Sequence, residues 1–214
     1  MKHLLIILVW VIVQPALCCK KKDDPPPINW KTYLPGTNWT GEYKYSSGVY
    51  VEPQPFSIAF SSTSFTWYDI KGNYTGTWDV IDFNKLSLDF TSGTKSAAVI
   101  GKNTMLNFKN LTVTNWDMLS IDLSSAPDPS QLSGTKWSGK LQNDPMNLSF
   151  QNTTDLQVSW GFPLIMPYSV FGSGVYFNNK PTAYFFGVFT GREKVFKGVS
   201  VINGMYKAWS VTRE

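Results

Sequence analysis

Two adjacent cysteines, Cys18 and Cys19, are the only thiols of the chain, and His3 is its only imidazole. Disulfide geometry requires Cα atoms further apart than chain neighbours can comfortably place them, so we do not expect the two cysteines to bridge each other. A segment that follows them and holds no histidine cannot form a Ser-His-Asp or Cys-His catalytic site, or a zinc site of the His/Cys kind. The chemistry left to these thiols is modification.

The residues before the cysteines have the layout of a secretory signal peptide. Lys2 precedes an uninterrupted apolar run from Leu4 to Val13, which is 10 residues long. A membrane-spanning helix needs about twenty such residues. We therefore expect residues 1–18 to be a signal peptide that is removed on export.

The cleavage junction resembles a bacterial lipobox, in which a small residue precedes a cysteine that becomes lipidated. Cys19 is the better candidate for lipidation, because Cys18 before it is small whereas Leu17 before Cys18 is bulky. Cys18 is the alternative, since Gly, Ala or Ser is the usual residue at the preceding position. The other interpretation is an ordinary secretory signal with two incidental cysteines.

Residues 19–30 are too polar and too rich in proline to bury anything, and we expect them to form an extended, lipidated tether. A lysine followed by Asp23 and Asp24 resembles the tether signal that sends some lipoproteins to the outer face of the outer membrane. The resemblance implies a cell-envelope protein that is lipid-anchored in the outer membrane and exposed at the surface. A solvated charged linker is the alternative reading of the same residues.

Carboxylates that could act as acid and base, or bind a metal, are scarce. The glutamates are Glu42, Glu52, Glu193 and Glu214. The aspartates fall mostly in turns or at outward strand positions, as Asp89 and Asp122 do, and no general acid and base can be assembled from them. Asp79 and Asp82 are too sparse for calcium, which needs several oxygen ligands. We expect no enzymatic activity, no metal and no cofactor.

The charge of the chain gives no sign of a nucleic-acid partner. The formal net charge is +4. When Lys2, the three tether lysines and the two tether aspartates are set aside, +2 remains for residues 25–214. A body this close to neutral has no basic face for nucleic acid, so we expect none as a partner.

Aromatic residues make up 15% of the chain and are its most abundant resource for recognition. Four tryptophans suit the core of a small β domain, namely Trp39, Trp78, Trp137 and Trp209. Residues 65–68 and 160–168 place consecutive large apolar groups where alternation would bury only half of them. We interpret 160–168 as an ordered loop with exposed apolar groups, which mark interaction surfaces, and keep core packing as the alternative. The candidate contact residues for a ligand or partner are Trp67, Tyr68, Trp160, Phe162 and Tyr168.

Apolar and polar residues alternate at period two in segment after segment, as in residues 56–60, 85–90, 118–123 and 147–150. Such alternation places one face of a strand against a core and the other in water. No apolar pattern of helical period continues for three turns between Ile28 and Glu214. The predicted fold class is all-β, without helices in this part of the chain.

An internal repeat divides this body. Residues 34–41 (LPGTNWTG) recur as residues 132–139 (LSGTKWSG), at an offset of 98 residues. The parallel continues downstream, because residues 56–60 answer 146–150 and Trp67 answers Trp160. The shared order of these features indicates duplication.

Residues 124–130 contain two prolines among small residues and are typical of a linker. We therefore expect two tandem antiparallel meander units, residues 31–124 and 131–214. Each would be a small barrel or sandwich, and the two units could be separate or packed as one body.

The repeat resembles the lipocalin and avidin group of meander barrels, in which a glycine shortly before a buried tryptophan opens the first strand. The resemblance implies that Trp39 and Trp137 each close one end of a barrel. The spacing is Gly-x-x-Trp in both copies, whereas the group has Gly-x-Trp. In the lipocalin group an arginine of a late strand covers this tryptophan. Arg213 could do so for Trp137, but the sequence offers no arginine for Trp39.

An anchor, a tether, a repeated β unit and surplus aromatic residues favour a binding protein. The leading hypothesis is a non-catalytic, protein-binding accessory subunit of an outer-membrane or cell-surface assembly. A second is a surface glycan-binding module that uses exposed aromatic rings. A third, implied by the resemblance to lipocalins, is a carrier of a small apolar ligand, although units under about 100 residues fill their interiors with side chains.

Overall fold

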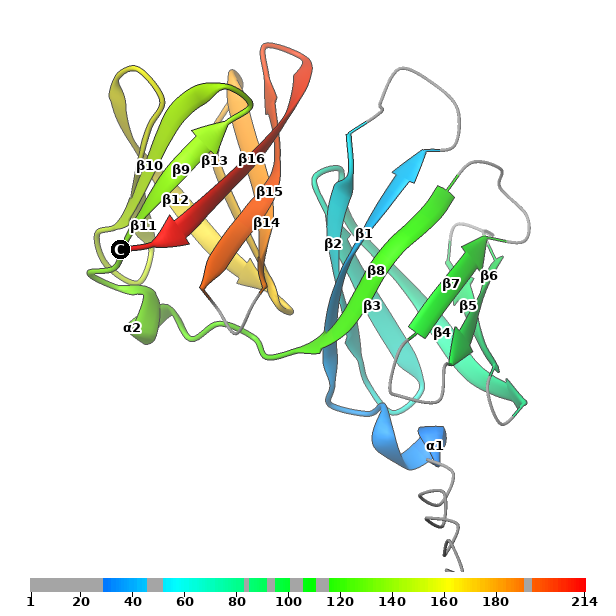
Figure 1. The fold of residues 1–214 in the computed structure, drawn as a ribbon. Helices are drawn as coiled ribbons and strands as arrows, with labels where there is room; N and C mark the ends of the chain where they lie inside the picture. Colours follow the sequence, from blue (N-terminus) through cyan, green and yellow to red (C-terminus); the bar gives the residue numbers. More distant parts are fainter. Residues whose placement is uncertain are drawn as a thin grey trace, which may run out of the picture.

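The computed structural model describes residues 29–45, 52–82, 85–91, 95–100, 106–110, 116–190 and 194–214. In these residues the predicted all-β class is confirmed, with two tandem antiparallel units (Figure 1). The predicted signal peptide, both cysteines and the charged part of the tether fall in residues 1–28, outside the described residues.

The first unit is an antiparallel sheet of eight strands in the order β7-β6-β5-β4-β3-β2-β1-β8. Its strands are β1 (Asn38–Tyr45), β2 (Gln54–Phe60), β3 (Ser64–Asp69), β4 (Gly72–Asp82), β5 (Lys85–Phe90), β6 (Lys95–Ile100), β7 (Leu106–Asn110) and β8 (Trp116–Ser124). Each strand from β1 to β6 pairs with the next along the chain, and β8 returns to pair with β1. The unit is an up-and-down meander with β7 and β8 as its outer strands.

The second unit closes on itself. Its strands are β9 (Lys136–Leu141), β10 (Asp144–Phe150), β11 (Asp155–Ser159), β12 (Pro163–Phe171), β13 (Gly174–Asn179), β14 (Ala183–Thr190), β15 (Val195–Ile202) and β16 (Met205–Arg213). Neighbours in sequence pair throughout, and β16 pairs with β9, so the strands form a closed barrel. Closure removes the free strand edges that invite pairing with other chains.

A single helical turn precedes each unit, and the prediction of an all-β body without helices is wrong for these two turns. They are α1 (Trp30–Tyr33) and α2 (Pro129–Leu132), of four residues each. The side chains of Asn29 and Asp128 cap them by accepting a hydrogen bond from the backbone N–H two residues later. One turn is too short to show a helical period in the sequence. Neither of these turns, nor any other helix in the described residues, could cross a membrane.

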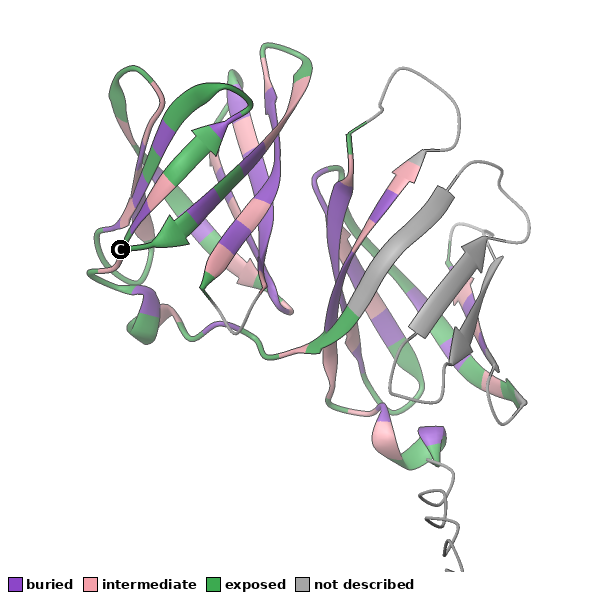
Figure 2. Ribbon diagram, in the orientation of Figure 1, coloured by how far each residue is buried: buried purple, intermediate pink, exposed green. Residues whose placement is uncertain are grey.

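Each unit encloses its own apolar core, and buried positions alternate with exposed ones along the strands (Figure 2). The largest inward side chains of the first unit include Trp39, Phe56, Trp67 and Trp78. In the second unit the ring centroids of Phe177 and Phe185 are 4.7 Å apart, and those of Phe189 and Phe196 are 4.3 Å apart. These rings occupy the interior of the closed barrel, as expected for a small barrel.

The two units pack against each other through β2, which is buried on both faces. Its inner face joins the first core, and the strand contacts β14 and β15 of the second unit. The outward side chains of β14 and β15 form an apolar cluster with Ile70, which follows β3, and its members are Phe186, Val188, Val199 and Val201. Sheet-on-sheet packing of this kind makes one body of the two units.

Polar and aromatic contacts accompany this apolar junction. The Oγ of Ser57, in β2, accepts a hydrogen bond from the Ser173 backbone N–H at 2.8 Å. The Nζ of Lys197 lies 2.7 Å from Glu42 Oε2. Tyr68 stacks on Phe171 with ring centroids 5.3 Å apart. The junction is therefore held at several places along the facing strands.

Candidate functional site

The repeated segment closes one end of the first unit. The Thr37 hydroxyl donates to the Leu34 carbonyl at 2.6 Å and accepts from Trp39 Nε1 at 3.0 Å. Gly36 has a φ of +81°, which glycine adopts without strain and which lets the chain turn across the end of the sheet. Trp39 is fully buried beneath this turn.

The second copy repeats the arrangement. The Thr135 hydroxyl donates to the Leu132 carbonyl at 2.6 Å and accepts from Trp137 Nε1 at 2.9 Å. The φ of Gly134 is +79°. The predicted repeat at an offset of 98 residues is confirmed for this motif, both in sequence and in hydrogen bonding.

Arg213 lies over Trp137, with its guanidinium carbon 5.9 Å from the ring centroid. The two residues are partners in the register that joins β16 to β9. The partner of Trp39 in β8 is Leu123, which is 50% exposed. The expectation that Arg213 covers Trp137 is therefore confirmed, and such a contact at an exposed site is worth about 0.5–1 kcal/mol.

The predicted correspondence of Trp67 to Trp160 is wrong, because the aligned strands place the two residues one inward position apart. Trp67 pairs with Ile58 in the ladder between β2 and β3. The equivalent position in the ladder between β10 and β11 is occupied by Val158. Trp160 therefore corresponds to Asp69 of the first unit. The prediction matches the two tryptophans by residue type, whereas the register of a strand follows the alternation of its inward and outward side chains.

Two of the predicted contact residues lie in the cores. Trp67 is 1% exposed and stacks on Phe56 with centroids 3.9 Å apart. Tyr168 is 6% exposed, and its hydroxyl donates to the Asn152 carbonyl at 3.1 Å. Burial raises the pKa of the Tyr168 phenol. Both residues are therefore packed in a core, which is the alternative interpretation of these segments.

Residues 160–168, predicted as an ordered loop, are mostly strand, because β12 begins at Pro163. The ladder to β13 begins only at Tyr168, so neither Pro163 nor Pro167 needs to supply an N–H on that side. The apolar residues of the segment are divided between the two faces of one strand. The loop prediction is therefore wrong from Pro163 onward.

The outward side of β12 presents apolar groups to solvent. We call Phe162, Pro163, Ile165, Pro167 and Phe171 the β12 face. The exposed fraction is 59% for Phe162, 69% for Ile165 and 37% for Phe171. A run of exposed apolar side chains on the outside of a barrel is typical of an interaction surface.

Trp160 and Tyr68 border this face without belonging to it. Trp160 is half-buried, and its ring centroid lies 5.5 Å from that of Phe185 and 6.1 Å from that of Phe162. Tyr68 is half-buried against Phe171 at the junction of the units. Of the predicted contact residues, Phe162 alone is exposed in large part. Ile165 was missed, and its outward place in a period-two strand was the signal.

Asp69 is a buried carboxylate that sequence reasoning did not single out, and it is 3% exposed at the end of β3. Its Oδ2 accepts from the Tyr43 hydroxyl at 3.0 Å and from Trp67 Nε1 at 3.1 Å. Its Oδ1 accepts from the Lys71 backbone N–H at 2.8 Å. Burial raises the pKa of Asp69, and these hydrogen bonds and the Lys71 charge oppose the rise. Its inward position, four residues after Phe65, was the available signal.

The hydrogen bonds of Asp69 fix the turn that reaches the second unit. Tyr68, just before it, stacks on Phe171, and Ile70, just after it, joins the apolar cluster on β14 and β15. Asp69 points the other way, into the first core. Its role in the described structure is to hold this turn in place.

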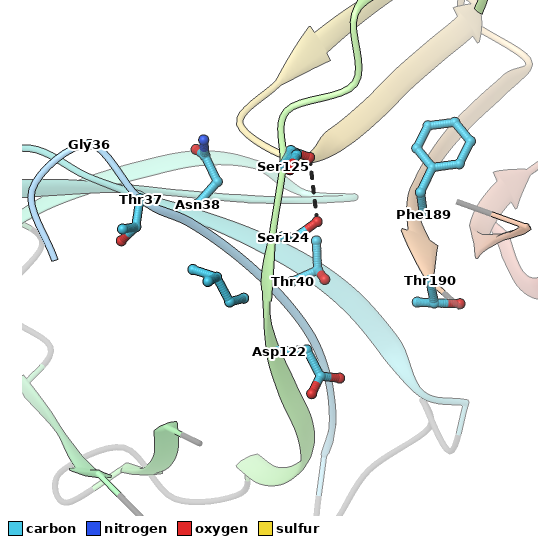
Figure 3. Close-up of a pocket in the computed structure, with 10 residues that line it drawn as sticks. Gly36, Thr37, Asn38, Thr40, Asp122, Ser124, Ser125, Phe189 and Thr190 are labelled. Atoms are coloured by element: carbon cyan, nitrogen blue, oxygen red, sulfur yellow. Dashed lines mark hydrogen bonds between the residues drawn. The ribbon is translucent and has the colours of Figure 1, made fainter. Parts of the chain in front are cut away.

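A cleft of about 610 Å³ lies where the two units meet (Figure 3). β1, the end of β8 and the residues that follow it form one side, and the end of β14 forms the other. The lining residues are Gly36, Thr37, Asn38, Thr40, Asp122, Leu123, Ser124, Ser125, Phe189 and Thr190. Hydroxyl groups predominate among the polar side chains.

No protein-family model matches this chain, and no curated protein matches its sequence.

Two of the described carboxylates, Asp69 and Asp79, make structural contacts. Within the described ranges, no group of three or more His, Cys, Asp or Glu side chains could hold a metal ion. Asp69 is engaged by three donors, and Asp79 pairs with Lys31 at 3.1 Å on the surface. The arrangement offers apolar contact at the β12 face and polar contact in the cleft.

Proposed function

We propose that this chain is a lipid-anchored, non-catalytic protein of the cell envelope that binds a protein partner through the β12 face, as an accessory subunit of an outer-membrane or surface assembly. The observation that supports a protein partner is the exposure of Phe162, just before β12, and of Ile165, within β12. The anchor rests on the sequence, where an apolar run leads to Cys19.

The chemistry of the β12 face suits side-chain docking. Pro163 and Pro167 have no backbone N–H, so a strand added beside this part of β12 would lack donors there. Fully burying Phe162 or Ile165 would contribute about 1.5–3 kcal/mol each. Large apolar anchors of this kind supply most of the affinity of protein interfaces.

The test is capture of partners from detergent-solubilised membranes of the producing organism, with the full chain as bait. We expect one protein to be recovered with the wild type, and at least about tenfold less with Ile165→Glu, because a charge must then be buried. Met205→Glu is the matched control, since Met205 is 58% exposed in the same unit and outside the β12 face. Equal recovery of the partner with Ile165→Glu and Met205→Glu would contradict the proposed docking surface, and so would the recovery of no partner.

The anchor is tested separately, by mass analysis of the mature chain. We expect an acyl group on Cys19 that Cys19→Ser removes and Cys18→Ser leaves in place. An unmodified amino terminus would remove the envelope assignment. The capture experiment would still decide the β12 face on its own terms.

A further inference from the structure

The cleft between the units is built from segments that meet only because the units pack together. Asn38 and Thr40 of β1 pair with Ser124 and Asp122 of β8 in the strand register. Thr190 faces them from the end of β14 (Figure 3). Neither unit forms this cleft alone.

A ligand in the cleft meets both side chains and strand edges. β1 is paired on both sides at Asn38 and Thr40, whereas β8 is an outer strand of the first unit and β14 is paired with β13 only up to Val188. The described ladders therefore leave one edge of β8, and the end of β14 beyond Val188, unpaired on one side. The available side-chain groups are the hydroxyls of Thr40, Ser124 and Thr190 and the amide of Asn38, each of which both donates and accepts hydrogen bonds.

The charge of the residues that line the cleft and the exposure of the Phe189 ring limit the class of ligand that the cleft can bind. Among the described lining residues the single charged group is the carboxylate of Asp122, which would repel a phosphate, a sulfate or an acidic sugar. Phe189 is 6% exposed, and its ring is stacked on Phe196 inside the barrel. It therefore offers no open platform for a nucleobase.

We propose that this cleft binds a short neutral oligosaccharide. Sugar hydroxyls both donate and accept, which matches the mixed groups of Asn38, Thr40 and Ser124, and Asp122 accepts from them. The volume of about 610 Å³ lies within the usual range for small-ligand sites. This site is independent of the β12 face.

The test is isothermal titration of the full mature chain with maltotriose, cellotriose and chitotriose, and with a sulfated oligosaccharide for comparison. We expect a neutral saccharide to bind and the sulfated one not to. Thr40→Val and Asp122→Asn should each weaken binding about tenfold, the effect of losing one good hydrogen bond. Thr77→Val, the same change at an exposed position of β4, should bind as the wild type does.

Thr40 is 4% exposed, so folding of Thr40→Val is checked by its thermal unfolding. Asp122 is exposed, and Asp122→Asn therefore tests the site even if Thr40→Val does not fold. The proposal is overturned if none of the neutral saccharides binds, if the sulfated one binds more tightly, or if Asp122→Asn leaves the affinity unchanged.

Discussion

Asp69 and Trp160 occupy equivalent inward positions, and each shows what one residue does to its unit. Trp160 extends the aromatic core of the second unit towards Phe185. Asp69 places a carboxylate where burial is costly unless donors surround it. Tyr43 and Trp67 supply two of those donors, so their polar atoms serve Asp69 while their rings fill the first core.

The raised pKa of Asp69 should make the free energy of unfolding depend on pH. Burial raises its pKa in the folded chain above the ordinary value of 3.8. The stabilising contribution of this group is therefore fully present below the unfolded pKa and is lost as the pH rises through the folded pKa. Asp69→Asn does not titrate, so the free energy of unfolding of the wild type relative to Asp69→Asn should fall as the pH rises above 3.8. Urea unfolding at a series of pH values measures this difference, and a difference that grows with pH would contradict it.

The elements of the two units begin alike. The first strand of each unit follows a capped helical turn, a glycine with positive φ and a threonine that is hydrogen-bonded to a tryptophan. The threonine satisfies the indole N–H and a carbonyl at once. The motif therefore closes the end of a sheet without leaving buried polar groups unpaired.

This duplication predicts the same loss from the same substitution in both units. Thr37→Val and Thr135→Val keep the side-chain shape but leave the indole N–H of Trp39 or Trp137 without its acceptor, which should cost about 1–3 kcal/mol of folding free energy in each. Thr153→Val, at an exposed turn, is the control. Chemical unfolding measures the losses, and a Thr135→Val variant as stable as the control would refute the role of the motif.

Much of the strand content was predictable from the sequence, because period-two alternation reports which side of a strand is buried. The repeat was predictable from the matching residues of 34–41 and 132–139. The place of Arg213 was implied by the resemblance to the lipocalin group. The two helical turns were not, because each is four residues long. The segment that forms β12 was predicted as a loop because it contains prolines at residues 163 and 167. These prolines do not interrupt the pairing of β12 with its neighbours.

The cleft lay beyond sequence reasoning. Its walls come from segments as far apart as Asn38 and Thr190, and only the packing of the two units brings them together. Asp122, expected on a solvated strand face, is exposed as predicted but lines this cleft. No local pattern reports how one barrel sits against its neighbour.

At the scale of the whole molecule, β2 joins the units because it is buried on both faces. Ser57 is central to that contact, being 0% exposed and bonded to Ser173 of the second unit. Its small side chain lets the facing sheets approach. The relative placement of the units therefore depends on small residues in β2 as much as on the apolar cluster around Ile70.

Ser57→Leu should separate the units without unfolding them. The added bulk meets the second unit, and overpacking at such a contact costs about 1–3 kcal/mol. We expect a larger radius of gyration in small-angle scattering and two calorimetric transitions in place of one. Ser62→Leu, at an exposed turn, should leave both unchanged. Unaltered scattering from Ser57→Leu would show that β2 does not hold the units together.

Each unit has eight strands, an even number, so the chain leaves each unit on the side where it entered. α1, α2 and the last residues of β16 accordingly lie towards one side of the molecule (Figure 1). If the proposed anchor holds the chain by its amino terminus, that side faces the attachment point and the hairpin turn before β12 points away from it. Substitutions in this turn would then alter contacts with a partner without changing the side by which the chain is attached.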